Sequence, residues 1–159
     1  MTPQEIMDLI DRSLFADLAY IDEDGKPVAC RFYCVWHRGI GRHIMSTGTW
    51  HKHSRCLMNG GDACLYFGDE SNCANVSLSG RCTVRQDQDL KALLWFEGDE
   101  HFFPLGVDDP TYCVLEFEAD SLRYYYEGTK GGMDSETIAA FDADRDAYVN
   151  GYKKTHPEG

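Results

Sequence analysis

The stretch ANVSLSGRCTVR, residues 74–85, alternates apolar and polar side chains along its whole length. A period of two residues is typical of a β-strand with one buried and one exposed face. Gly80 in the middle of the apolar face indicates a bulge or a sharp bend. The stretch therefore predicts a long, half-buried strand of the kind found in small barrels.

Similar but shorter apolar runs, separated by turns, extend the β pattern through most of the chain. The expected strands are 15–21, 26–37, about 43–46, 63–67, 112–118 and 122–126. Asp24-Gly25 is a favoured hairpin turn between the first two. Together these strands and turns predict a mainly β fold, a closed or partly open antiparallel barrel of six or seven strands.

Helices are expected as attachments to this barrel. Thr2-Pro3-Gln4-Glu5 has the pattern of a capping box that begins a helix, and apolar residues then recur at helical spacing up to Leu14. Residues 86–95 and 137–149 are the other expected helices. Gly128, Gly131 and Gly132 predict a flexible link, so we divide the chain into a barrel domain, 1–127, and a C-terminal extension, 128–159, with a loose end.

Composition excludes several classes of protein. The formal net charge of −12 disfavours nucleic acid and anionic membranes as partners. No apolar run is as long as a membrane span, and the opening MTPQE does not have the pattern of a signal peptide. Seven cysteines without regular spacing favour a reducing compartment, and we expect a cytoplasmic location.

Positive charge is concentrated in one segment of this acidic chain. Residues 25–61 contain six Lys and Arg, four of the six His, and no Asp or Glu. Within the segment, IMSTGTWHKHSRCLMNGG (44–61) reads as a strand end, a turn, and a short helix capped by Thr49. Such a helix start suits an anion. We therefore expect a phosphate site; its candidate ligands are Arg31, Ser46, Thr47, His51 and Lys52.

Other chemistries find less support in the spacing of residues. Cys30-x3-Cys34 and His51-x-His53 do not match common zinc sites, so no metal is expected. A haem, which needs only one such His ligand, is harder to exclude. The chain contains no Gly-x-Ser-x-Gly, no GxGxxG and no P-loop, and we assign no catalytic residue.

The ordered motifs resemble the pyridoxamine 5′-phosphate oxidase-like superfamily of FMN-binding split β-barrels, in its general stress protein and nitroimidazole-resistance-like branches. The matching segments are FADLAYIDEDGKPVACRFY (15–33), IMSTGTWHKHSRCLMNGGDACLYF (44–67), NVSLSGRCTV (75–84) and FFPLGVDDPTYCVLEFEADSLRYY (102–125). Trp50 and His51 depart from the residues usual at their positions. A C-terminal Trp and Arg region specific for pyridoxamine is not apparent, which argues against vitamin B6 activity.

The resemblance implies specific cofactor contacts and a homodimer. Arg31, Ser46 or Thr47, and His51-Lys52 would bind the phosphate of FMN. Phe32, Tyr33 and Cys34 would run along the flavin ring, and Asn75 would reach it from the partner chain. The flavin would lie at the subunit interface and transfer two electrons to a small molecule, with NAD(P)H as one plausible partner. The alternatives are a non-enzymatic haem- or flavin-binding protein and a deazaflavin-dependent reductase of the same fold.

Overall fold

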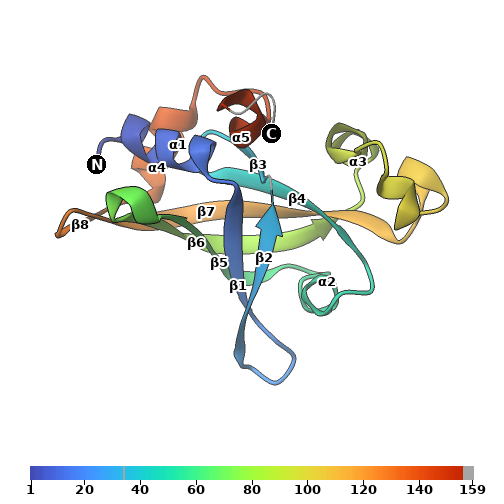
Figure 1. Ribbon diagram of the computed structural model, residues 1–159. Helices are drawn as coiled ribbons and strands as arrows, with labels where there is room; N and C mark the ends of the chain where they lie inside the picture. Colours follow the sequence, from blue (N-terminus) through green and yellow to red (C-terminus); the bar gives the residue numbers. More distant parts are fainter. Residues whose placement is uncertain (34, 156–159) are drawn as a thin grey trace.

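The computed structural model describes residues 1–33 and 35–155, so Cys34 and the last four residues of the expected loose end lie outside the described residues. One antiparallel sheet dominates, in the order β2-β1-β5-β6-β7-β4-β3, with β8 paired to β7. Figure 1 shows how strongly this sheet curls. The strands are β1 (Phe15–Ile21), β2 (Pro27–Tyr33), β3 (Trp36–Arg38), β4 (Arg42–Gly48), β5 (Gly61–Asp69), β6 (Ala74–Arg85), β7 (Tyr112–Tyr126) and β8 (Thr129–Met133). The expected mainly β, antiparallel barrel architecture is confirmed.

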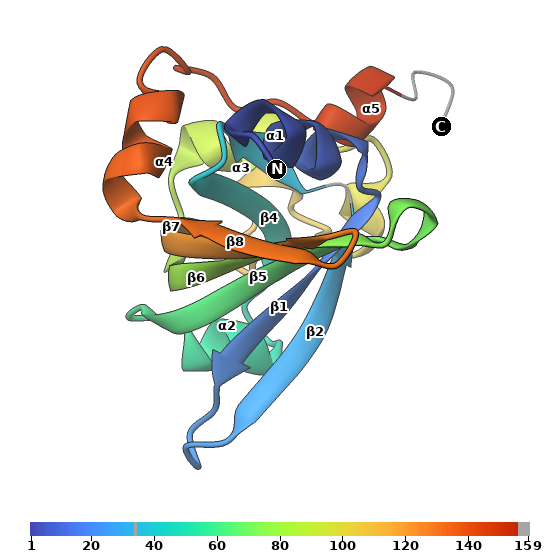
Figure 2. The same ribbon diagram turned by 90° about the vertical axis from the view of Figure 1, so that its left-hand side faces the viewer.

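Helices border the curled sheet. They are α1 (Pro3–Arg12), α2 (Lys52–Cys56), α3 (Gln88–Leu94), α4 (Ser135–Asp142) and α5 (Gly151–Thr155), with single 3₁₀ turns η1 (Glu70–Asn72), η2 (Asp99–His101) and η3 (Gly106–Asp108). The capping box predicted at Thr2 and Glu5 is present at the start of α1. Figure 2 shows α1, α4 and α5 at one end of the sheet and α2 beside the β1–β2 hairpin at the other.

The main core lies inside the curl of the sheet. Ile6, Leu9 and Ile10 of α1 point into it and are buried. The apolar face of β6 supplies Val76 and Leu78, neither of which has any exposed surface. The alternation seen in the sequence therefore orients β6 as expected, because a strand with one apolar face must turn that face to the core.

The bulge predicted from Gly80 is confirmed. Ser79 pairs with Ser121 and Gly80 pairs with Ala119, so Asp120 of β7 is an extra residue without a partner on β6. This extra residue also explains one wrong prediction. Residues 112–118 and 122–126 were expected to be two strands, but the bulge carries β7 through the polar interruption as one strand.

Two further strand predictions need correction. The expected strand 26–37 is divided: β2 pairs with β1, whereas β3 pairs with β4, so the chain changes partner between them. The expected flexible link at Gly128, Gly131 and Gly132 contains β8, which pairs with β7. Glycine suits this strand because a Cβ at Gly132 would lie 2.7 Å from the backbone oxygen of Leu122, and a Cβ at Gly131 would meet the ring of Tyr124.

The C-terminal segment contains two short helices instead of the single helix predicted, and it packs on the barrel. Helix α4 ends at Asp142 instead of continuing to Val149, and α5 begins at Gly151 and continues into the loose end expected at 153–159. The carboxylate of Asp142 accepts hydrogen bonds from the backbone N–H groups of Ile40 and Gly41, both at 2.8 Å. Val149 exchanges two backbone hydrogen bonds with His37 of β3. These contacts fasten the segment to the β3–β4 turn.

Candidate functional site

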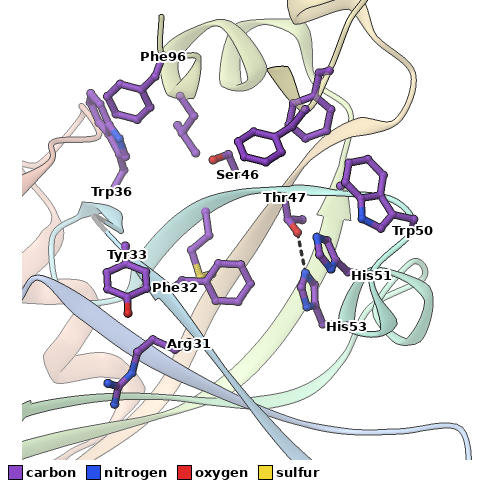
Figure 3. A pocket seen from close by; sticks show the side chains of 15 residues that line it. Arg31, Phe32, Tyr33, Trp36, Ser46, Thr47, Trp50, His51, His53 and Phe96 are labelled. Carbon is purple, nitrogen blue, oxygen red and sulfur yellow. Dashed lines mark hydrogen bonds between the residues drawn. The ribbon is translucent and has the colours of Figure 1, made fainter. Parts of the chain in front are cut away.

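The candidate site is a cavity of about 340 Å³ at the open side of the sheet, between β2 and β4. Figure 3 shows the side chains that surround it. They are Arg31, Phe32, Tyr33, Trp36, Met45, Ser46, Thr47, Gly48, Trp50, His51, His53, Leu94, Phe96, Phe102 and Phe103. Six of the nine residues expected to bind the cofactor belong to this set: Arg31, Phe32, Tyr33, Ser46, Thr47 and His51.

A partly buried polar chain links α2 to β4 at one wall. His53 Nε2 lies 2.7 Å from Oγ1 of Thr47, drawn as a dashed line in Figure 3, and His53 Nδ1 lies 3.8 Å from Sγ of Cys30. Burial, reinforced by nearby His51, lowers the pKa of His53 to about 4, so its ring is neutral near pH 7. Burial also raises the pKa of Cys30 to about 11, so Cys30 is a protonated thiol rather than a nucleophile.

The start of α2 differs from the expectation. The helix has five residues and its N-cap is His51, not Thr49, without a side-chain capping bond. The His51 ring stacks on that of His53, with centroids 5.0 Å apart and an interplanar angle of 14°. Trp50 covers the other side of His51 at 5.3 Å. This aromatic stack, rather than a ring of cations, forms the wall at the helix start.

Arg31 lies at the opposite end of the cavity and is already paired. Its guanidinium donates two hydrogen bonds to Asp17, at 2.8 and 3.0 Å, and lies 3.7 Å from the centroid of the Phe15 ring. The hydrogen bond from Arg31 holds the pKa of Asp17 below its usual value. The side chains of the pair are partly exposed, at 46% for Arg31 and 34% for Asp17. The ion pair therefore contributes little net free energy, and an anion of higher charge can displace the carboxylate.

Lys52 and Asn75 lie away from this cavity. Lys52 Nζ is 3.1 Å from Oδ2 of Asp22 in the β1–β2 turn, and that contact raises the pKa of Lys52. Asn75 lines a separate hollow on β6, β7 and β8 together with Arg123 and Lys130. Within one chain the structure therefore does not bring these two residues to the other candidates, and Cys34 lies outside the described residues.

An aromatic hood covers the cavity on the α3 side. We give this name to Trp36, Leu94, Phe96, Phe102 and Phe103, which all line the cavity. Phe103 belongs to a ring cluster with Trp50 at 5.4 Å and Tyr112 at 4.9 Å. The family resemblance implied that the aromatic residues Phe102 and Phe103 would partly line the interface and the pocket, and both line this cavity. The sequence missed Trp36, Phe96 and His53, for which a clear signal was lacking because their role depends on distant segments meeting.

A sequence model of the family described as "Pyridoxamine 5′-phosphate oxidase like" matches residues 45–142. The chain belongs to this family. A relative from Bacillus subtilis (strain 168), general stress protein 26, is 28% identical over 133 residues, which are 80% of this chain and 90% of the relative. The matched segment contains Ser46, Thr47, His51 and the α3 part of the hood.

Solved structures of other proteins have the same fold. A protein from Clostridium acetobutylicum, related to general stress protein 26 and of the pyridoxinephosphate oxidase family, aligns with a TM-score of 0.73 at 27% identity, covering 87% of this chain and 99% of its own. A haem-binding protein from Mycobacterium smegmatis aligns with a TM-score of 0.68 at 18% identity, covering 88% and 61%. At that identity, the second likeness concerns the fold alone.

The described part of the chain has two further properties that bear on function. It contains no helix long and apolar enough to cross a membrane. It also holds no group of three or more His, Cys, Asp or Glu side chains arranged to bind a metal ion.

Proposed function

We propose that this member of the pyridoxamine 5′-phosphate oxidase-like family binds FMN in the cavity between β2 and β4 and transfers two electrons to a small molecule. The observation that carries the proposal is the cavity itself, which Arg31 of β2 and Ser46 and Thr47 of β4 all line, although the two strands lie toward opposite ends of the strand order in the sheet. FMN would supply the redox chemistry, and the protein would bind and orient it.

The residues on the cavity wall fit the parts of FMN. Phe32 and Tyr33 of β2 offer an aromatic edge to the planar ring, and the hydroxyls of Ser46 and Thr47 offer hydrogen bonds to its polar atoms. A phosphate carries more negative charge than the single carboxylate of Asp17. Because the Arg31–Asp17 pair is partly exposed, exchange of Asp17 for a phosphate would cost little.

A haem is the second candidate, favoured by one observation at His51. Its imidazole lines the cavity, is exposed, and forms no side-chain hydrogen bond within residues 1–33 and 35–155. A neutral imidazole with a free nitrogen is a competent axial ligand for haem iron. His53 is less suitable, because Thr47 and Cys30 lie beside both of its ring nitrogens.

We further propose a homodimer in which Asn75 reaches the flavin of the partner subunit. This assignment would give Asn75 a role although it lies outside the cavity of its own chain. NAD(P)H is the proposed electron donor. A cytoplasmic location is also proposed, in keeping with the buried, disulfide-free thiols of Cys82 and Cys113.

The deciding experiment is the visible spectrum of the purified protein, followed by titration with FMN and mass identification of any released cofactor. A flavin spectrum that NADPH or NADH bleaches supports the oxidoreductase. A sharp haem band that disappears in His51→Ala supports the haem binder instead. A colourless protein that takes up no added FMN would refute the FMN proposal. Sedimentation at several protein concentrations tests the dimer.

A further inference from the structure

Trp36 places an unpaired hydrogen-bond donor at the wall of the cavity. Its indole Nε1 is buried and has no hydrogen-bond partner within the described residues. A buried N–H without an acceptor costs stability, and an acceptor atom on a ligand would remove that cost. Figure 3 shows the nitrogen of Trp36 and the hydroxyl oxygen of Ser46 turned toward each other across the upper part of the cavity.

The other unpaired buried atom of the described chain has a different setting. Nδ1 of His43 also has no partner, but His43 has no exposed surface and does not line the cavity. Its ring is surrounded by Phe67, Phe117 and His37 inside the core. Of these two atoms, only the Trp36 donor belongs to a side chain that lines the cavity.

Apolar rings line the same cavity as this donor. Phe96 and Phe102 both belong to its wall, and Phe102 is 65% exposed although it is large and apolar. A solvent-exposed phenylalanine at the mouth of an aromatic cavity gains free energy when a flat apolar surface covers it. The shape and chemistry of the hood therefore suit a planar aromatic molecule.

The charges near the hood disfavour an anion. The loop from Phe96 to Phe103 carries Glu97, Asp99 and Glu100. Among the residues described as lining the cavity, Arg31 is the one lysine or arginine, and it is paired with Asp17. Lys153 of α5 lies 3.3 Å from the centroid of the Phe96 ring, so the three acids of the loop outnumber one lysine at the hood. The local net charge around the hood is therefore neutral to negative.

We propose that the aromatic hood is the substrate subsite, and that it takes an uncharged planar aromatic molecule with an acceptor oxygen, such as a quinone. Trp36 Nε1 donates a hydrogen bond to that oxygen, and Phe102 covers the ring. This inference rests on the proposed function, since the substrate is placed next to the FMN. The proposed substrate class excludes phosphorylated compounds, because a phosphate bound in the hood would need an unpaired cation there.

The test is equilibrium dialysis of the full-length, FMN-loaded protein with three probes: naphthoquinone, naphthalene, and naphthoquinone sulfonate. Naphthoquinone should bind most tightly, and the anionic sulfonate should bind at least tenfold more weakly. Trp36→Phe should weaken naphthoquinone by about three- to tenfold, the loss of one hydrogen bond, and leave naphthalene unchanged. Phe102→Ala should weaken naphthoquinone and naphthalene alike.

Leu105→Ala is the matched control for Phe102→Ala. Leu105 is in the same loop and is 73% exposed, but it does not line the cavity, so its removal should change no probe. The proposal would be overturned if the sulfonate bound as tightly as naphthoquinone. It would also be overturned if Phe102→Ala and Leu105→Ala weakened probe binding equally, or if Trp36→Phe changed the affinity for naphthalene. FMN affinity is measured separately by flavin fluorescence. A protein that fails to bind FMN fails the proposed function, whereas one that binds FMN normally but shows these results fails the subsite alone.

Discussion

Nε2 of His53 lies 2.7 Å from Oγ1 of Thr47, and this hydrogen bond between two side chains joins helix α2 to strand β4 at the cavity wall. The ring is half-buried, and burial lowers the pKa of His53 to about 4. Protonation would place a positive charge beside the His51 ring, 5.0 Å away between centroids, in a poorly solvated position. Acid should therefore weaken this end of the cavity before the rest of the barrel.

We expect His53→Gln to lose less stability than the wild type between about pH 6.5 and pH 4. Unfolded, His53 takes up its proton near 6.5, but in the folded protein only near 4. The unfolded state thus binds more protons across this window, and stability falls as the pH falls. For a half-buried ring we expect a difference of about 2 kcal/mol. Urea unfolding at both ends of the window measures it.

His101→Gln serves as the control, because His101 is exposed on η2 and does not line the cavity. This variant should lose the same stability with acid as the wild type. An unchanged pH dependence in His53→Gln would show that His53 takes up its proton at an ordinary pH, and would contradict the neutral, half-buried ring described above.

Arg31 and Lys52 should differ as phosphate contacts, although the sequence places both in the same acid-free segment. Arg31→Gln should weaken FMN binding by about tenfold, because Arg31 lines the cavity and a charge-assisted hydrogen bond is lost. Lys52→Gln should change it less than about twofold, because Lys52 pairs with Asp22 outside the cavity. Asp17→Asn should tighten binding by freeing Arg31. Titration of flavin fluorescence gives all three affinities.

Comparing the FMN affinities of these three variants also locates the phosphate. If Lys52→Gln weakened FMN binding as strongly as Arg31→Gln, the phosphate would lie at the start of α2, as the sequence suggested. If Asp17→Asn had no effect while Arg31→Gln weakened binding, Asp17 would not compete with the phosphate. Thermal unfolding of each variant without FMN separates a loss of contact from a loss of fold.

The barrel could be predicted because the sequence patterns that determine its strands and turns are local. The alternation in β6 and the Asp-Gly turn after β1 fix faces and hairpins within a dozen residues. Where the pattern failed, the cause was a long-range contact. Gly131 reads as a flexible link until the Tyr124 ring lies against it, and the polar break in β7 reads as a strand end until the bulge absorbs Asp120.

The site could be predicted only in part, for the same reason. Ser46, Thr47 and Arg31 lie in recognisable strands, and the structure brings them to one cavity. The side chain of Lys52 was expected to point at that cavity, yet its direction depends on Asp22, thirty residues away in the sequence. The hood depends on β3 meeting the loop after α3, which no local pattern of Trp36 or Phe96 encodes.

Asp142 should contribute strongly to stability although it is far from the cavity. Its carboxylate accepts hydrogen bonds from two backbone N–H groups, those of Ile40 and Gly41, in the β3–β4 turn. Asp142→Ala would leave both donors without their acceptor, at a cost of about 2 kcal/mol in the free energy of unfolding. Urea denaturation at neutral pH measures this cost.

Asp144→Ala is the matched control, because Asp144 follows α4 two residues later and is exposed. It should stay within about 0.5 kcal/mol of the wild type. A similar loss in both variants would mean that a carboxylate near the end of α4, rather than the contact with the β3–β4 turn, stabilises the fold.

Gly80→Ala tests whether the bulge is required for the curl of the sheet. A Cβ at Gly80 would clash with the backbone carbonyl oxygen of Glu118 on β7, and backbone atoms of two paired strands cannot move apart without breaking their hydrogen bonds. We expect Gly80→Ala to lose about 2 kcal/mol or more in urea unfolding, whereas Ser79→Ala, one residue earlier and exposed, should lose less than about 0.5 kcal/mol.

Because β6 and β7 connect the two sides of the sheet that face each other across the cavity, Gly80→Ala should also weaken FMN binding more than Ser79→Ala does. A destabilised variant with unchanged FMN affinity would separate the bulge from the geometry of the site.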